Sequence, residues 1–80
     1  MTEIIQILQA LQEIAEDQTI PKNVRTVIQT TMVALQQPTT LRLNASKALQ
    51  HLETLSETTN VEAFTRSQLY NIVSMLETIR

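Results

Sequence analysis

Hydrophobic side chains recur every three or four residues in four stretches of the chain, and polar stretches separate them. This spacing places side chains on one face of an α-helix, so the pattern predicts four amphipathic helices. The expected core-facing stripes are Ile4, Ile7, Leu8, Leu11, Ile14 and Ala15 in the first; Val24, Val27, Ile28, Met32 and Leu35 in the second; Leu41, Ala45, Ala48, Leu49, Leu52 and Leu55 in the third; and Phe64, Leu69, Ile72, Val73, Leu76 and Ile79 in the fourth.

The first polar break separates the first two helices. The first helix, with Thr2 as a plausible N-cap, is expected to end at the stretch 16–19. The second is expected to begin near Thr19 or Ile20. Pro21 then falls in its first turn, where the missing N–H costs nothing.

Two further breaks separate the remaining helices. The stretch 36–38 ends the second helix, and Pro38 is expected to start the third. The stretch 56–60 ends the third, and the fourth is expected to run from about Val61 to the C-terminus. Short connections make consecutive helices antiparallel neighbours, so we expect an all-α fold of four antiparallel helices paired as two hairpins. A closed bundle is favoured over an open stack, but the sequence does not separate them.

The two halves, residues 1–37 and 38–80 of a single helical domain, look alike. When the sequence is shifted by 41 residues, six of 28 aligned positions are identical between 8–35 and 49–76. The identical pairs include Leu11 with Leu52 and Arg25 with Arg66. A period of just over 40 residues that holds two helices is typical of HEAT-type repeats. We therefore expect an internal repeat.

The composition excludes several classes of protein. The chain has 80 residues, no cysteine and no glycine, so it lacks disulfides, cysteine zinc sites and glycine-rich phosphate loops. No apolar run approaches the roughly 20 residues that span a bilayer. Net charge is −2 and the six cations are scattered, which argues against nucleic-acid binding. We expect a cytoplasmic protein with no cofactor and no membrane contact.

Three arginines, Arg25, Arg42 and Arg66, each fall early in an expected helix, where the helix dipole disfavours a cation. The structural interpretation is that each guanidinium bonds the end of the preceding helix or an acid there. Glu16 with Arg25 and Glu57 with Arg66 occupy matching positions in the two halves, which suggests repeated ion pairs. The functional interpretation is a row of arginines that binds an anion.

Candidate catalytic and metal-binding residues are few. His51 is the only histidine, and Glu53, two residues away, points elsewhere on a helix. Glu13, Glu16 and Asp17 have metal-ligand spacing, but they lie beside a break and suit a solvated surface. We therefore expect no catalytic residues and no metal site.

Two segments carry a family resemblance. The stretch "EIAEDQTIPKNVR" and the ending "VSMLETIR" resemble the small archaeal all-helical proteins of unknown function in the uncharacterised protein family numbered 0147. The resemblance covers essentially the whole chain and implies a helical fold, but it brings no activity. Where "EAFTR" stands, this chain lacks the proline of the other copies, at position 62. The phrase formed by Pro21, Val24 and Arg25 also resembles HEAT-like hairpins, more weakly.

Three functions are compatible with these features. The favoured one is a non-catalytic protein–protein interaction module or assembly subunit, whose partner is itself, as a homodimer, or another protein. Ile5, Val33, Leu43 and Tyr70 lie off the main stripes and are its candidate interface. The alternative is a nucleic-acid-associated protein that uses the Arg25, Arg42 and Arg66 row. An enzyme is the least favoured, because so small a domain has little room for a polar pocket.

Overall fold

Four helices account for most of the residues that the computed structural model describes, 4–58 and 61–79. They are α1 (Ile4–Glu16), α2 (Lys22–Leu35), α3 (Leu41–Thr58) and α4 (Ala63–Ile79). No strand occurs within these ranges. The all-α prediction is therefore confirmed.

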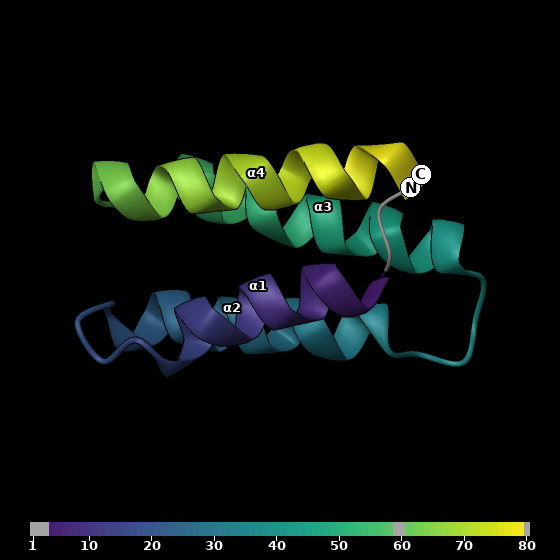
Figure 1. Ribbon diagram of the computed structural model, residues 1–80, viewed down its shortest axis with the longest axis horizontal. Helices are drawn as coiled ribbons and strands as arrows, with labels where there is room; N and C mark the ends of the chain where they lie inside the picture. The colour runs from purple at the N-terminus through teal and green to yellow at the C-terminus, as the bar shows by residue number, and fades with distance from the viewer. Residues whose placement is uncertain (1–3, 59–60, 80) are drawn as a thin grey trace.

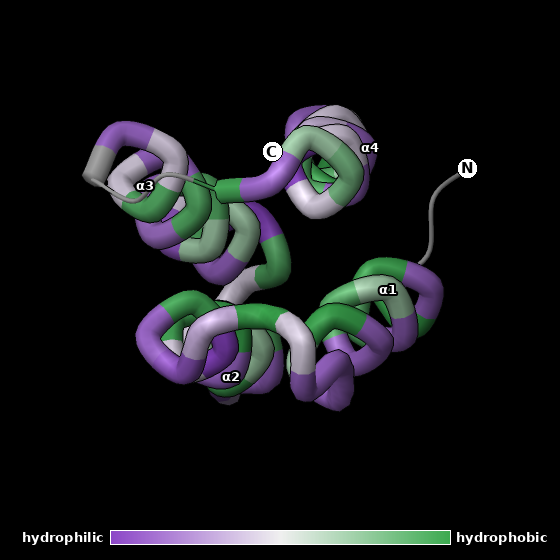
Figure 2. The backbone as a smooth tube through the Cα atoms, turned by 90° about the vertical axis from the view of Figure 1, so that its left-hand side faces the viewer, coloured by the Kyte–Doolittle hydropathy of each residue, from purple (hydrophilic) through white to green (hydrophobic). Residues whose placement is uncertain are grey.

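The helices run up and down as two hairpins, α1–α2 and α3–α4, stacked on each other (Figure 1). Viewed end-on, they occupy the corners of a quadrilateral (Figure 2). Each helix packs on its two neighbours, and neither diagonal pair is in contact within the described residues. The radius of gyration is 11.6 Å, close to the roughly 12 Å expected for a globular chain of this length. The hairpins thus close into a bundle.

Aliphatic side chains from all four helices fill the centre of this bundle. The largest fully buried ones are Ile7, Leu11, Ile14, Val24, Ile28, Leu49, Leu52, Leu69, Ile72 and Leu76. All of them lie on the stripes that the sequence predicts. The two halves also bury matching positions: Leu11 and Leu52, Ile28 and Leu69, and five further pairs separated by 41 residues are buried in both.

The four contacts between neighbouring helices are unequal. α2 and α3 share the largest interface, and α1 and α4 share the smallest. The buried alanines Ala34, Ala45 and Ala48 allow the backbones of α2 and α3 to approach closely. A shift of 41 residues replaces these alanines by Met75, Ile4 and Ile7 in α4 and α1. α1 and α4 thus carry bulkier side chains at the matching positions, and we call their interface the α1–α4 seam.

Two helix starts differ from the sequence prediction. Pro21 lies outside α2 as its N-cap residue, with φ −55° and ψ 146°, and accepts the first helical bond from Arg25 N at 3.1 Å. α3 begins at Leu41 rather than Pro38. Thr40 is better suited than proline to begin this helix, because its hydroxyl accepts a hydrogen bond from Leu43 N at 3.2 Å.

The link between α2 and α3 depends on Asn44, a residue that the sequence pattern does not single out. Asn44 is 3% exposed. Its Nδ2 donates to Gln37 O at 2.9 Å and, more weakly, to Leu35 O at 3.4 Å, and its Oδ1 accepts from the Thr39 hydroxyl. A side-chain amide therefore satisfies carbonyls at the end of α2, where many helices use a glycine.

The predicted core contains two errors. Phe64 and Leu41 are 66% and 43% exposed, although their spacing places them on the stripes. Both lie in the first turn of a helix, at an end of the bundle, where little of the neighbouring helices covers them. Thr31 and Thr65 are buried instead. Thr31 satisfies its hydroxyl within its own helix, by donating to Val27 O at 2.8 Å.

Candidate functional site

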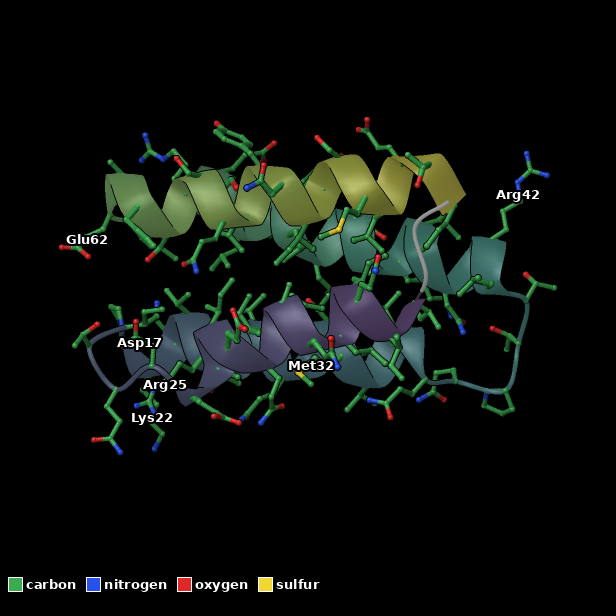
Figure 3. The ribbon with its side chains drawn as sticks, viewed as in Figure 1. Asp17, Lys22, Arg25, Met32, Arg42 and Glu62 are labelled. Carbon is green, nitrogen blue, oxygen red and sulfur yellow. The ribbon has the colours of Figure 1, made fainter. Side chains whose placement is uncertain are left out.

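The three arginines do not form a row. Because the helices alternate in direction, α2 and α4 start at one end of the bundle and α3 starts at the other. Arg25 accordingly lies at the end opposite to Arg42 (Figure 3), and Arg66 lies at the same end as Arg25. A single anion-binding surface cannot use all three side chains.

Arg25 lies beside the link between α1 and α2 rather than against Glu16. Its Nε is buried and has no hydrogen-bond partner among the described residues. Asp17, in this link, accepts hydrogen bonds from the hydroxyl and the backbone N–H of Thr19, at 2.6 and 2.9 Å. The hydroxyl bond, followed by the backbone bond, holds the pKa of Asp17 below its ordinary value; partial desolvation opposes this, and the Arg25 charge adds a smaller lowering.

The other charged residues proposed for helix-end contacts have separate surroundings. Arg66 Nη2 donates to Val61 O at 3.3 Å, so this guanidinium contacts the start of its own helix. Glu16 accepts a hydrogen bond from Gln12 Nε2 at 2.7 Å. Arg42 and Glu57 are exposed. Between described residues, neither the Glu16–Arg25 nor the Glu57–Arg66 ion pair forms.

Both aromatic side chains of the protein lie on the surface of α4. Phe64 is 66% exposed and Tyr70 is 59% exposed, and the chain has no other phenylalanine, tyrosine or tryptophan. Ser67, Asn71 and Ser74 are also exposed and follow the same spacing of three and four residues. We call these five residues the α4 outer face. It is an uncharged strip with an aromatic group at its start and another about 9 Å along the helix axis.

The remaining candidate interface residues are also in contact with solvent. Ile5, Val33 and Leu43 are 57%, 58% and 46% exposed. They lie on three different helices, near the end of the bundle where α1 and α3 start and α2 ends. The positions of these three residues and of Tyr70 off the main stripes predict this exposure. The spacing of Phe64 matches the core stripe and predicts burial instead.

A pocket of about 210 Å³ opens at the other end of the bundle, between the starts of α2 and α4. We call it the end pocket. Its lining residues are Thr19, Ile20, Pro21, Val24, Val61, Glu62 and Thr65. Glu62 and the residues around Pro21, including Asp17 and Lys22, lie at this end in Figure 3.

A second hollow follows the α1–α4 seam and has a volume of about 250 Å³. Its lining residues are Ala10, Glu13, Gln68, Asn71, Ile72 and Met75. Ala10 contributes only a methyl group to this lining. The lining therefore combines three apolar residues with one carboxylate and two amides.

Across residues 4–58 and 61–79, no three His, Cys, Asp or Glu side chains cluster so as to hold a metal ion. In the same portion of the chain, no helix has the length and apolar character needed to cross a bilayer. His51 is half-buried on α3.

Solved structures share this fold. The crystal structure of unknown function protein MMP1188 superposes with a TM-score of 0.90 at 38% identity, over 95% of this chain and 88% of that one. The crystal structure of a protein from uncharacterized family UPF0147 of Thermoplasma acidophilum gives a TM-score of 0.88 at 35% identity, over 95% and 91% of the two chains.

Proteins with similar sequences carry the same family name. The chain is 36% identical over 75 residues to UPF0147 protein Ta0600 of Thermoplasma acidophilum, which covers 92% of this chain and 85% of that protein. It is 32% identical over 74 residues to the UPF0147 protein of Archaeoglobus fulgidus, over 92% and 85% of the two. Such relatives come from archaea. Residues 1–79 match the family as a whole, and the chain therefore belongs to the uncharacterised protein family UPF0147.

Proposed function

We propose that this protein is a non-catalytic interaction module that binds another protein through the α4 outer face. The observation that supports this proposal is the position of the two aromatic side chains. Burying a side chain as large as phenylalanine contributes about 1.5–3 kcal/mol to folding. This small domain forgoes that contribution and keeps Phe64 and Tyr70 in water.

The surroundings of these aromatics suit a protein partner. Protein interfaces are enriched in tyrosine and phenylalanine and depleted in charge at their centres. Ser67 and Ser74 lie on the same strip, are small and uncharged, and leave room for a partner to approach. Aromatic side chains also supply many of the few residues that dominate binding energy.

The nucleic-acid alternative has less support. A protein that binds phosphates needs cations on one surface. Arg42 lies at the end of the bundle opposite to Arg25, as Figure 3 shows. The acids Asp17 and Glu62 also lie at the Arg25 end, where they oppose the cations.

Affinity capture tests the proposal. The tagged protein is incubated with extract of its own source cells at two salt concentrations, with and without nuclease, and the retained partner is then purified and recombined with it. We expect a stoichiometric protein complex that survives both treatments. The double variant Phe64→Ser, Tyr70→Ser should lose at least about tenfold in affinity for the purified partner.

The matched control is Val33→Ser, Leu43→Ser, which removes two exposed apolar side chains from other helices. It should bind the partner normally. If the control loses affinity and the α4 variant does not, the α4 outer face is the wrong surface. Retention only at low salt, abolished by nuclease, would replace the protein partner with a nucleic acid.

A further inference from the structure

The end pocket is lined by an almost completely buried residue with a polar side chain, Thr65. Its side chain is 5% exposed, yet its hydroxyl makes no hydrogen bond with the described protein groups. Among the described residues, only Arg25 Nε is a fully buried side-chain polar atom without a partner, so the Thr65 hydroxyl keeps contact with solvent through the pocket that Thr65 lines. The corresponding residue of the other half is Val24, on the opposite wall of the same pocket. Valine has the same shape, so packing alone does not require a hydroxyl at position 65.

The rest of the lining defines what the end pocket can accept. Four of its seven residues, Ile20, Pro21, Val24 and Val61, are apolar. Hydrogen-bond donors also lie beside them, because α2 starts at Lys22 with no side-chain cap from the described residues and its first-turn N–H groups precede the first helical bond. An apolar body with a hydrogen-bond acceptor matches this combination.

The charge around the end pocket and its volume further restrict which ligands it can hold. Glu62 is part of the lining, and both acids and cations lie around it at this end, so no excess of either sign selects a charged ligand. A volume of about 210 Å³ corresponds to about seven water molecules at liquid density. It lies below the range of roughly 300–1,000 Å³ that holds drug-sized ligands and cofactors. One amino-acid side chain fits this size.

We propose that the end pocket receives a branched aliphatic side chain of the protein partner, whose own peptide carbonyl accepts a hydrogen bond from Thr65. This inference rests on the proposed function and adds the residue type that the partner presents. Phe64 directly precedes Thr65, so the pocket adjoins the start of the α4 outer face. A peptide that crosses this start covers Phe64 and places its side chain between α2 and α4.

Titration with a capped amino acid tests the pocket without knowledge of the partner. N-acetyl-leucinamide is added to ¹⁵N-labelled protein, and amide chemical shifts are followed. We expect changes confined to residues 19–24 and 61–65 and a Kd on the order of 1 mM, typical of so small a ligand. N-acetyl-alaninamide should bind more weakly. The proposal would be overturned if no shifts appear at a ligand concentration about 20–30 times the expected Kd, or if the shifts centre on the α1–α4 seam.

Two matched threonine variants isolate the hydroxyl. Thr65→Val should weaken binding about fivefold to tenfold through the lost hydrogen bond. Thr31→Val, which removes a buried hydroxyl already bonded within α2, should leave binding unchanged. The melting temperature of Thr65→Val should equal or exceed that of the wild type. A fall of more than about 5 °C would instead give the hydroxyl a structural role and refute its assignment to a ligand.

The remaining outcomes separate this inference from the proposed function. If N-acetylleucine, which carries a carboxylate, binds more than tenfold better than the neutral amide, the pocket is an anion site and the aliphatic assignment is wrong. If the partner complex depends on Phe64 and Tyr70 but the capped amino acid does not bind, the α4 outer face stands and the pocket proposal falls. If the capped amino acid binds but no protein partner exists, the proposed function fails.

Discussion

Replacing Asn44 by aspartate tests whether one buried amide holds the link between α2 and α3. The change is nearly isosteric, but it puts an oxygen where Nδ2 donates to Gln37 O and Leu35 O at 2.9 and 3.4 Å. Each lost hydrogen bond contributes about 1 kcal/mol, and leaving buried carbonyls unsatisfied adds a similar amount. We expect the free energy of unfolding at pH 7 to fall by about 3 kcal/mol. For a domain of this size, that corresponds to a loss of about 12–24 °C in melting temperature.

The pH dependence of this variant gives a second check. Burial and the facing carbonyls should raise the pKa of the new carboxyl in the folded state above its unfolded value of about 3.9. A raised pKa means that the folded state binds the proton more tightly, so the penalty is largest above the folded pKa. It should shrink as pH falls through that value, because a protonated carboxyl can donate to one carbonyl.

Urea unfolding followed by circular dichroism at pH 7 and pH 4.5 measures both effects. Asn71→Asp is the control, since it makes the same chemical change at an exposed position on α4. If the two variants unfold at free energies within about 0.5 kcal/mol of each other at pH 7, Asn44 does not hold the link and our account of the connection is wrong.

Three further predictions follow from burial, from the Asp17 turn and from the unequal helix interfaces. Leu11→Ala should lower the free energy of unfolding by about 2–5 kcal/mol, because Leu11 is 0% exposed. Leu43→Ala should lower it by less than about 0.5 kcal/mol, because Leu43 is 46% exposed. Equal losses in urea unfolding would contradict the core assignment. The pKa of Asp17 is lowered in the folded state, so its carboxylate stabilises the fold above the unfolded pKa of 3.8, and this stabilisation is lost as pH falls through the folded pKa. Asp17→Asn should therefore lose less stability between pH 4 and pH 2 than the wild type. Identical acid unfolding curves would count against the Thr19 hydrogen bonds. Central amides of α1 and α4 should exchange with deuterium at least about tenfold faster than those of α2 and α3, because the α1–α4 seam is the smallest interface; uniform protection would show that the seam does not open first.

Much of the fold was predictable because one physical pattern dominates it. Leu11, Ile28, Leu52 and Leu69 each belong to a stripe of apolar residues at helical spacing, and a bundle of short-linked helices has few ways to bury four such stripes. Phe64 has the same spacing and is exposed, because periodicity gives the direction of a side chain from its helix and not whether a neighbouring helix reaches that far.

The candidate site was less predictable, for two different reasons. The division of the arginines between two ends was within reach of the sequence, since antiparallel helices already place Arg42 opposite to Arg25 and Arg66. The role of Asn44 was not, because asparagine in a helix usually contacts solvent and its partners at Leu35 and Gln37 meet it only when the chain turns back. The end pocket likewise joins residues about 40 positions apart.

The absence of glycine has a consequence for the unfolded chain. No residue in the described part of the structure has a positive φ, so every turn uses backbone conformations that ordinary residues prefer. Glycine loses more conformational freedom on folding than any other residue, at a cost of roughly 0.5–1 kcal/mol relative to alanine. A chain with 80 residues and none of them glycine starts from a less disordered unfolded ensemble. This entropic advantage helps a domain with no disulfide to remain folded while two aromatic rings stay in water.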